Sequence, residues 1–144
     1  MINSFDNEYA FLSNFYPSPI IMCAANGEYV TALTVEHYFQ AMKTKDITQQ
    51  LQILRATTPG QAKRLGRKCT LREDWEEIKD QVMLNALRQK FMDKQFKEKL
   101  LATGNQILVE GNTWGDTYWG VCRGQGKNKL GKLLMQVREE IKNE

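Results

Sequence analysis

The sequence predicts an α+β fold, a mainly helical single domain that spans residues 1–144 and contains a small β-sheet. Two patterns and the chain length predict it. Apolar residues recur at spacings of three and four along most of the chain after the first quarter, which is typical of amphipathic helices. Short apolar runs flank Asn26-Gly27 in residues 20–31, which is typical of a β-hairpin. A chain of 144 residues is long enough to form one domain around one hydrophobic core.

The first predicted helix follows the hairpin and begins after Thr34, whose side chain can cap it. Val35, Tyr38, Phe39 and Met42 recur at helical spacing on one side of this helix. We therefore expect this side to pack on the core along the whole helix.

Further helices and one strand complete the predicted order of elements. Pro59 favours a helix start after Thr58, and Gly104 favours a helix end. The remaining predicted helices cover residues 46–55, 59–66, 75–92, a short segment around Leu100-Leu101, and a last helix with the apolar stripe Leu130, Leu133, Leu134, Val137 and Ile141. Residues 106–109 are a predicted strand, and residues 112–128 are a predicted glycine-rich loop.

Composition excludes several classes of site. The longest apolar run, Ile20 to Ala25, is too short to cross a membrane, and the N-terminus carries no secretion signal. We therefore expect a cytoplasmic protein without a membrane partner. Three scattered cysteines and the single histidine, His37, do not have the spacing of metal ligands, so we expect no metal and no cofactor. With one histidine, acid and base chemistry falls mainly to carboxylates and lysine.

The first helix also carries a polar stripe. Glu36, Gln40 and Lys43 follow one another at helical spacing, about 100° around the helix from its apolar side. One interpretation is a solvated pair of charges on an ordinary amphipathic helix. The other is a carboxylate and an amine at the edge of a buried cleft.

Two loops contain residues that suit a nucleotide-like ligand. In residues 114–120, Asp116 lies among aromatic residues, which either anchor the loop in the core or stack on a nucleobase. Asp116 itself is either a turn former or a functional carboxylate. In residues 11–16, Asn14 either satisfies local backbone groups or hydrogen-bonds a base or a ribose.

Positive charge occurs in two stretches that contain no acidic residue: Lys63, Arg64, Arg67, Lys68 and Arg72, and then Arg123, Lys127, Lys129, Lys132 and Arg138. Each stretch is either a solvated helix face or an anion site. Residues 126–132 match the glycine and lysine spacing of a phosphate-binding loop. However, Leu133 stands where such loops need Ser or Thr, which argues against a nucleotide triphosphatase. The start of the last helix remains suited to a phosphate.

Several motifs in order resemble the NADAR family and its YbiA-like group. They are Phe11-Leu12-Ser13-Asn14-Phe15, Glu36-His37-Tyr38-Phe39-Gln40-Ala41 with Lys43, Gly66-Arg67, Trp75 with Lys79 and Met83, Lys90-Phe91, Tyr118-Trp119-Gly120, and Asn128-Lys129-Leu130-Gly131. Cys122 departs from the family pattern, which commonly has glycine there. The resemblance implies a YbiA-like fold and a hydrolase of the N-glycosidase class. Its substrates would be either phosphoribosylamino-pyrimidine intermediates of riboflavin synthesis or ADP-ribose attached to guanine in nucleic acid.

Cleavage of an N-glycosidic bond builds positive charge on the ribose carbon, which a nearby carboxylate stabilises. Glu36 is the first candidate and Asp116 the second. A desolvated Lys43 could trap the ribose carbon as a Schiff base, a route that the resemblance also implies. The candidate substrate-binding residues are Asn14, Phe15, Gln40, Arg67, Trp75, Tyr118, Trp119, Gly120 and Asn128.

The expected partner is a ribosylated base that carries phosphate groups, either free or as ADP-ribosylated DNA or RNA. The expected oligomeric state is a monomer or a weak oligomer. The alternative from another class is a module that binds ADP-ribose or a nucleotide without catalysis.

Overall fold

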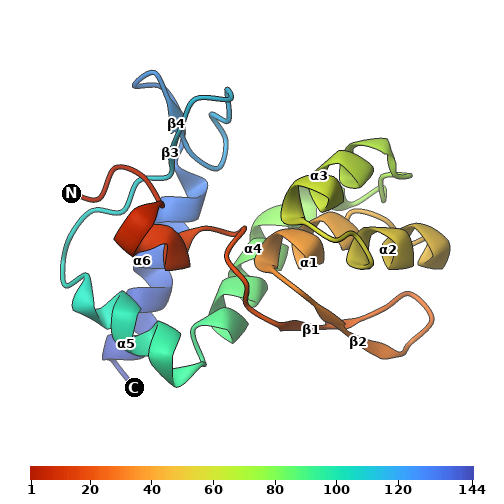
Figure 1. Ribbon diagram of the computed structural model, residues 1–144, viewed down its shortest axis with the longest axis horizontal. Helices are drawn as coiled ribbons and strands as arrows, with labels where there is room; N and C mark the ends of the chain where they lie inside the picture. Colours follow the sequence, from red (N-terminus) through yellow and green to blue (C-terminus); the bar gives the residue numbers. More distant parts are fainter. The chain divides into compact units, whose positions relative to one another are not determined.

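Six α-helices carry most of the secondary structure of the computed structural model, which describes residues 1–144 (Figure 1). By their internal contacts the residues form two units. The central unit, named for its place in the sequence, is Asn14–Ala86, and the terminal unit combines Met1–Ser13 with Leu87–Glu144. Helix α4 (Trp75–Lys90) contributes residues to both. The predicted α+β class, mainly helical with little sheet, is confirmed.

The central unit begins with the predicted hairpin. Strand β1 (Ile20–Cys23) pairs antiparallel with β2 (Tyr29–Ala32), and Gly27 adopts φ +85° in the turn between them. Glycine favours this left-handed conformation because it has no Cβ. Helix α1 (Val35–Ala41) follows, and every one of its residues is buried. The predicted cap is confirmed, since the Thr34 side chain accepts a hydrogen bond from the His37 amide.

Two helices pack against α1 in the central unit: α2 (Ile47–Leu54) and α3 (Pro59–Lys68). Side chains cap both helices, from Asp46 and from Thr58, so the predicted start after Thr58 is confirmed and the helix predicted from Asp46 begins one residue later. Helix α3 extends beyond the predicted end at residue 66. The approach of α3 to α1 requires glycine at this point, because a Cβ on Gly66 would overlap the Gln40 side chain.

The terminal unit contains the 3₁₀-helix η1 (Asn7–Leu12), α5 (Lys94–Ala102) and α6 (Lys129–Lys142). Its short strands β3 (Gly111–Asn112) and β4 (Val121–Cys122) pair in parallel. Helix α6 buries Leu130, Leu134 and Val137 of the predicted stripe, whereas Leu133 and Ile141 are only half-buried.

The strand predicted at residues 106–109 is wrong. These residues form only a single bridge, Ile2 with Leu108, and regular pairing starts at Gly111. The N-terminal segment offers one residue for pairing, because Ile2 donates to the Ile107 carbonyl and accepts from the Val109 amide. Leu108 is nevertheless completely buried, which explains the strand-like apolar pattern. No helix is both long enough and apolar enough to span a membrane.

Candidate active site

Glu36 lies on α1 and is buried, with 7% of the residue exposed. The Gln40 side-chain amide, one turn along the helix, donates to Glu36 Oε1 at 2.8 Å. The Glu36 backbone amide donates to the Asn14 carbonyl at 3.1 Å, which ties the preceding segment to the start of the helix. Asn14, Glu36 and Gln40, three of the predicted site residues, therefore lie together in the central unit.

Lys43 lies in the turn that follows α1 rather than in the helix itself. This corrects the prediction that helical geometry carries the polar stripe through Lys43, since α1 ends at Ala41. A turn hydrogen bond from the Lys43 amide to the Gln40 carbonyl, 3.2 Å, continues the course of the chain. The Lys43 amine lies 5.8 Å from the centre of the Phe39 ring and makes no hydrogen bond or ion pair.

The electrostatic environment of Lys43 favours its neutral form. Burial lowers the pKa of Lys43, and the positive charges of Arg67 and Lys63 lower this pKa further, while Glu36 and Cys69 oppose the shift. The two cations come from α3, so packing of this helix against α1 brings their charges toward the amine. A larger fraction of Lys43 is therefore nucleophilic at neutral pH than of an ordinary surface lysine.

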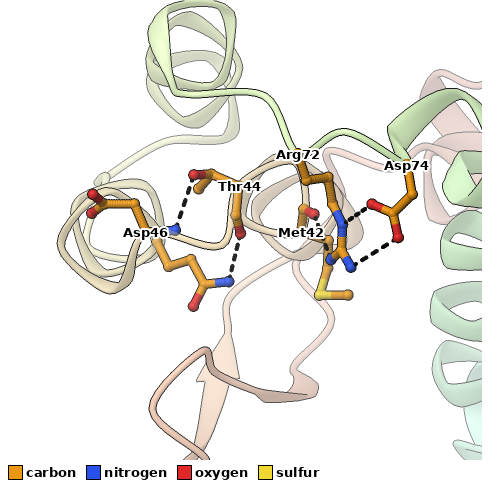
Figure 2. A network of polar contacts seen from close by, with 6 residues as sticks. Met42, Thr44, Asp46, Arg72 and Asp74 are labelled. Carbon is orange, nitrogen blue, oxygen red and sulfur yellow. Dashed lines mark hydrogen bonds and ion pairs between the residues drawn. The ribbon is translucent and has the colours of Figure 1, made fainter.

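Polar contacts hold the backbone at Lys43 and on both sides of it, and Figure 2 shows those at the flanking residues Met42 and Thr44. The Lys43 carbonyl accepts from the Arg72 amide at 2.8 Å. The Arg72 side chain forms an ion pair with Asp74. The carbonyl of Thr44, the residue after Lys43, accepts from the side-chain amide of Gln50 at 2.8 Å. The turn that carries Lys43 is thus tied to α2 and to the segment before α4.

Two buried oxygen atoms in the central unit have no hydrogen-bond partner: Asn14 Oδ1 and Gln40 Oε1. The amide nitrogens of the same side chains do have partners. Asn14 Nδ2 donates to Met83 Sδ at 3.5 Å, and Gln40 Nε2 donates to Glu36 Oε1. An unsatisfied buried acceptor costs about 1–3 kcal/mol, so each is a position where a ligand donor would be favourable.

The basic residues of the first stretch do not all gather at Lys43. Arg67 is exposed and has no ion-pair partner, whereas Arg72 is paired with Asp74. Lys63 is half-buried, and Arg64 and Lys68 are exposed on the same helix. Lys63 and Arg67, four residues apart and so on one face of α3, are the pair whose charges reach Lys43.

The aromatic candidates of the central unit differ in exposure. Trp75 is 5% exposed and packs edge to face against Phe39, with ring centres 5.0 Å apart. This contact supports the ring over which Lys43 lies. Phe15, by contrast, is 44% exposed. Whether either ring contacts a substrate stays a prediction.

His37 is fully occupied by structural contacts. One ring nitrogen lies 2.8 Å from Thr34 Oγ1 and the other 2.9 Å from the Ala56 carbonyl, and the residue is completely buried. No group of three or more His, Cys, Asp or Glu side chains is arranged to hold a metal ion.

In the terminal unit, Asp116 organises the loop between β3 and β4. Its Oδ1 accepts from the amides of Tyr118 and Trp119 at 3.1 and 2.9 Å, the geometry of a turn former. The Asn112 side chain makes two hydrogen bonds with the Asp116 backbone. Its nitrogen donates to the Asp116 carbonyl, and its oxygen accepts from the Asp116 amide. Asp116 Oδ2 makes no hydrogen bond, so one carboxylate oxygen remains available.

The aromatic residues of this loop contact one another and two cations. Tyr118 and Trp119 pack edge to face with ring centres 4.9 Å apart. The amines of Lys127 and Lys129 lie 5.3 and 5.9 Å from the centre of the Tyr118 ring. Gly120 is buried, and a Cβ there would overlap Glu110, so the residue has a packing function.

The start of α6 is not the open anion site that the sequence suggests. The backbone amides of residues 127–130 donate to the carbonyls of Thr117, Gly120, Tyr118 and Trp119, and are therefore not available to a phosphate. The second basic stretch also disperses, since Arg138 is buried and donates to Thr103 Oγ1 at 2.9 Å.

Asn128 has a structural function at this helix start. Its side chain accepts from the Glu110 amide at 3.0 Å and donates to the Leu108 carbonyl at 2.9 Å. The oxygen and the nitrogen of this side-chain amide are thus both bonded to backbone groups, and contact of Asn128 with substrate stays a prediction.

Sequence reasoning did not single out Asn112, Cys69 or the Arg72–Asp74 pair. Burial raises the pKa of the half-buried Cys69 thiol while Lys43 lowers it, so this thiol lies within electrostatic reach of the candidate nucleophile. An Arg and an Asp two residues apart just before a predicted helix start is a signal that could have been noticed. The signal for Asn112 is weak, because asparagine is common in loops.

Similarity to known proteins identifies the family of this chain. The NADAR domain family matches residues 2–142. The chain belongs to the NADAR family. It is 43% identical over 142 residues to the N-glycosidase YbiA of Escherichia coli, an alignment that covers 96% of this chain and 85% of that protein.

Other NADAR proteins extend this comparison. An N-glycosidase of Nostoc punctiforme is 42% identical over 142 residues, covering 94% of this chain and 87% of that protein. A riboflavin biosynthesis protein of Vibrio vulnificus is 39% identical over 140 residues, covering 94% of this chain and 36% of that longer protein. The NMR structure of E. coli YbiA superimposes with a TM-score of 0.80 at 39% identity, covering 99% of this chain and 88% of that one. The NADAR chain described here is accordingly an N-glycosidase.

Proposed function

We propose that this N-glycosidase cleaves the bond between C1 of a phosphate-bearing ribose and the amine nitrogen of a base, with Lys43 as the nucleophile. The observation that carries the proposal is the half-buried Lys43 amine without a hydrogen-bond partner, close enough to the buried Glu36 carboxylate to interact with its charge. An ordinary lysine is neutral in fewer than about one molecule in a thousand at pH 7, so a lowered pKa directly increases the attacking species.

In the first step the neutral Lys43 amine attacks C1 of the ribose and the bond from C1 to the base nitrogen breaks. The Glu36 carboxylate takes a proton from the lysine nitrogen and delivers it to the leaving nitrogen, so the base departs as a neutral amine. The bond from C1 to the ring oxygen then opens, that oxygen takes a proton from water, and a protonated Schiff base between Lys43 and C1 forms. Water adds at C1 and loses one proton to the solvent. The bond from C1 to the lysine nitrogen then breaks as the hydroxyl proton passes to that nitrogen, which releases the open-chain ribose aldehyde and the neutral Lys43 amine.

Gln40 supports this role for Glu36. Its amide donates to one carboxylate oxygen and holds the group in one orientation, which a proton shuttle requires. The unpaired oxygens of Gln40 and Asn14 are acceptors, and amino-pyrimidines, guanine and ribose all present N–H or O–H donors. Arg67 and Lys63 provide the charge that a phosphate would match.

Asp116 stays a predicted catalytic residue, as Tyr118, Trp119 and Trp75 stay predicted substrate-binding residues. The steps above use residues of the central unit and do not depend on Asp116. Replacing Asp116 by Asn tests it separately, since Oδ1 can still accept both backbone hydrogen bonds while the negative charge is lost.

The proposed substrate class is a phosphoribosylamino-pyrimidine. The name of the Vibrio relative, a riboflavin biosynthesis protein, supports this choice, as does a maize relative of similar name that is 40% identical over 149 residues. ADP-ribosylated guanine, free or in nucleic acid, is the second class that the family resemblance implies.

The test is to incubate the protein with each substrate class and follow the released base by mass spectrometry. We expect base release from the pyrimidine and, with borohydride present, a covalent ribose adduct on Lys43. Binding without base release from either class would indicate a non-catalytic nucleotide-binding module. An adduct that persists in Lys43→Ala would assign the nucleophile to another residue.

A further inference from the structure

Lys43 lies outside α1, so the helix alone does not fix the position of its amine. A lysine side chain has four rotatable bonds, and the position of its amine therefore depends on how firmly the backbone is held. The Lys43 backbone is held on both sides: its amide donates to Gln40, and its carbonyl accepts from the Arg72 amide at 2.8 Å.

The Arg72 side chain adds a contact with the same turn. Its Nη1 donates to the Met42 carbonyl at 3.5 Å, one residue before Lys43. Figure 2 shows the Arg72 guanidinium between this carbonyl and Asp74. Carbonyls at a helix C-terminus carry partial negative charge, so a cation is favourable there. One residue thus contacts two successive carbonyls of the Lys43 turn, with its backbone and with its side chain.

Asp74 fixes Arg72 in turn. Two parallel hydrogen bonds join the side chains, Nε to Oδ1 at 2.6 Å and Nη2 to Oδ2 at 3.3 Å. This two-point geometry orients the planar guanidinium, which a single contact cannot do. The Asp74 carbonyl accepts from the Ile78 amide at the start of α4, so the pair is anchored to a long helix.

From this geometry we infer that Arg72, oriented by Asp74, is a positioning residue for Lys43 in the glycosidase reaction. The inference rests on the proposed function, in which Lys43 attacks the ribose. The pair leaves little net charge near Lys43, because the guanidinium is balanced by a carboxylate. Its effect is therefore on the position and hydration of the amine.

The Arg72–Asp74 pair is poorly explained by a contribution to the stability of the fold alone. The side chains are 18% and 37% exposed, and ion pairs that water can reach contribute little to the free energy of unfolding. A shift of about 1 Å in a reacting group can lower a rate by about 100-fold. Loss of Arg72 should therefore affect catalysis much more than stability.

The chain offers a matched control in Arg88 and Glu140. These residues form the same two-point pair, at 3.0 and 2.8 Å, but they belong to the terminal unit and involve no residue of the Lys43 turn. The variants are Arg72→Gln, Arg72→Lys, Asp74→Asn and the control Arg88→Gln. Each is assayed for base release, thermal unfolding and borohydride trapping at several pH values.

We expect Arg72→Gln to lower kcat about 10- to 100-fold with little change in KM, and Asp74→Asn to lower it less. The pH at which trapping is half-maximal should rise, because a less firmly held Lys43 amine is better hydrated beside Glu36, Cys69, Lys63 and Arg67. Arg72→Lys should recover part of the rate, since an ammonium can reach a carbonyl but cannot form the two-point pair. Arg88→Gln should change neither kcat nor the pH midpoint.

The inference is overturned if Arg72→Gln keeps the wild-type kcat and pH midpoint, or if it loses no more activity than Arg88→Gln. Direct NMR titration of the Lys43 ε-methylene group separates this result from failure of the proposed function. If the wild-type protein forms no lysine adduct, the proposed nucleophile is wrong. A Lys43 titration that is unchanged by Arg72→Gln refutes the positioning role even if catalysis occurs.

Discussion

The turn after α1 and the end of α4 each hold a lysine whose pKa is lowered by burial, but the two amines differ in what surrounds them. Lys90 is 1% exposed, its amine donates to the Ser13 carbonyl at 2.9 Å, and it lies 5.4 and 5.5 Å from the ring centres of Phe91 and Phe96. Lys43 is only half-buried and has neither a hydrogen bond nor an ion pair.

The comparison teaches that burial alone does not make a nucleophile. Burial lowers the pKa of Lys90 to about 7, yet its amine is occupied by a backbone carbonyl and is shielded from any ligand. Lys43 combines a lowered pKa with an unoccupied amine, a nearby carboxylate and two cations. Availability and neighbouring charges distinguish the candidate catalytic lysine from the structural one.

The largest expected effect is that of Lys43→Ala. We expect kcat to fall by on the order of 10³-fold or more, because the covalent route is lost. Base release under substrate saturation is the measurement, and Lys90→Met is the matched control. If Lys90→Met, at equal folded concentration, lost as much activity as Lys43→Ala, the distinction between the two lysines would be wrong.

Glu36→Gln should lower kcat by roughly two to four decades, since the variant keeps the shape of the side chain but cannot carry protons. Glu77→Gln, at an exposed position on α4, is the control and should be neutral. A pH–rate profile of both variants is the measurement. An unchanged rate in Glu36→Gln would leave Lys43 without its proposed proton partner.

Lys90 predicts a pH dependence of stability. An unfolded lysine titrates near 10.5 and Lys90 in the folded state at about 7, so between these values the unfolded chain binds more protons. The free energy of unfolding should therefore rise with pH from about 7 to 10.5, by a few kcal/mol and at most about 5. Below pH 7 both states are protonated and Lys90 contributes no further slope.

Urea unfolding of the wild type and of Lys90→Met across this pH range isolates the contribution of Lys90. The difference between the two proteins removes the effects of all other titrating groups. Equal slopes in both would show that Lys90 stays protonated in the folded protein throughout the range.

The smallest expected effect is that of Gly66→Ala. This variant tests the comparison of the two lysines because it changes the surroundings of Lys43 and leaves those of Lys90 unchanged. A Cβ at this position would overlap Gln40, so we expect a loss of about 1–3 kcal/mol of stability and a lower kcat as Glu36 loses its partner. Gly60→Ala is the control, because the added Cβ would meet only Thr58 Oγ1, at 3.9 Å. Full activity of Gly66→Ala would show that Gln40 does not need its present position.

Much of the fold could be predicted because its signals are local. The caps at Thr34, Asp46 and Thr58, the hairpin turn at Gly27 and the stripe of α6 depend on residues within a few positions of one another. The missed strand β3 is two residues long, and its partner β4 begins ten positions later in the sequence. Such short pairings leave no periodic pattern to detect.

Of the candidate site, the sequence determined which chemical groups α1 and its following turn carry: a carboxylate, an amide and an amine in close succession. Tertiary structure decided that Glu36 is buried, that Lys63 and Arg67 act on Lys43, and that Arg72 holds its turn. The physical reason is that pKa values, desolvation and backbone support depend on neighbours brought together by packing. Helical spacing along one segment cannot specify these neighbours.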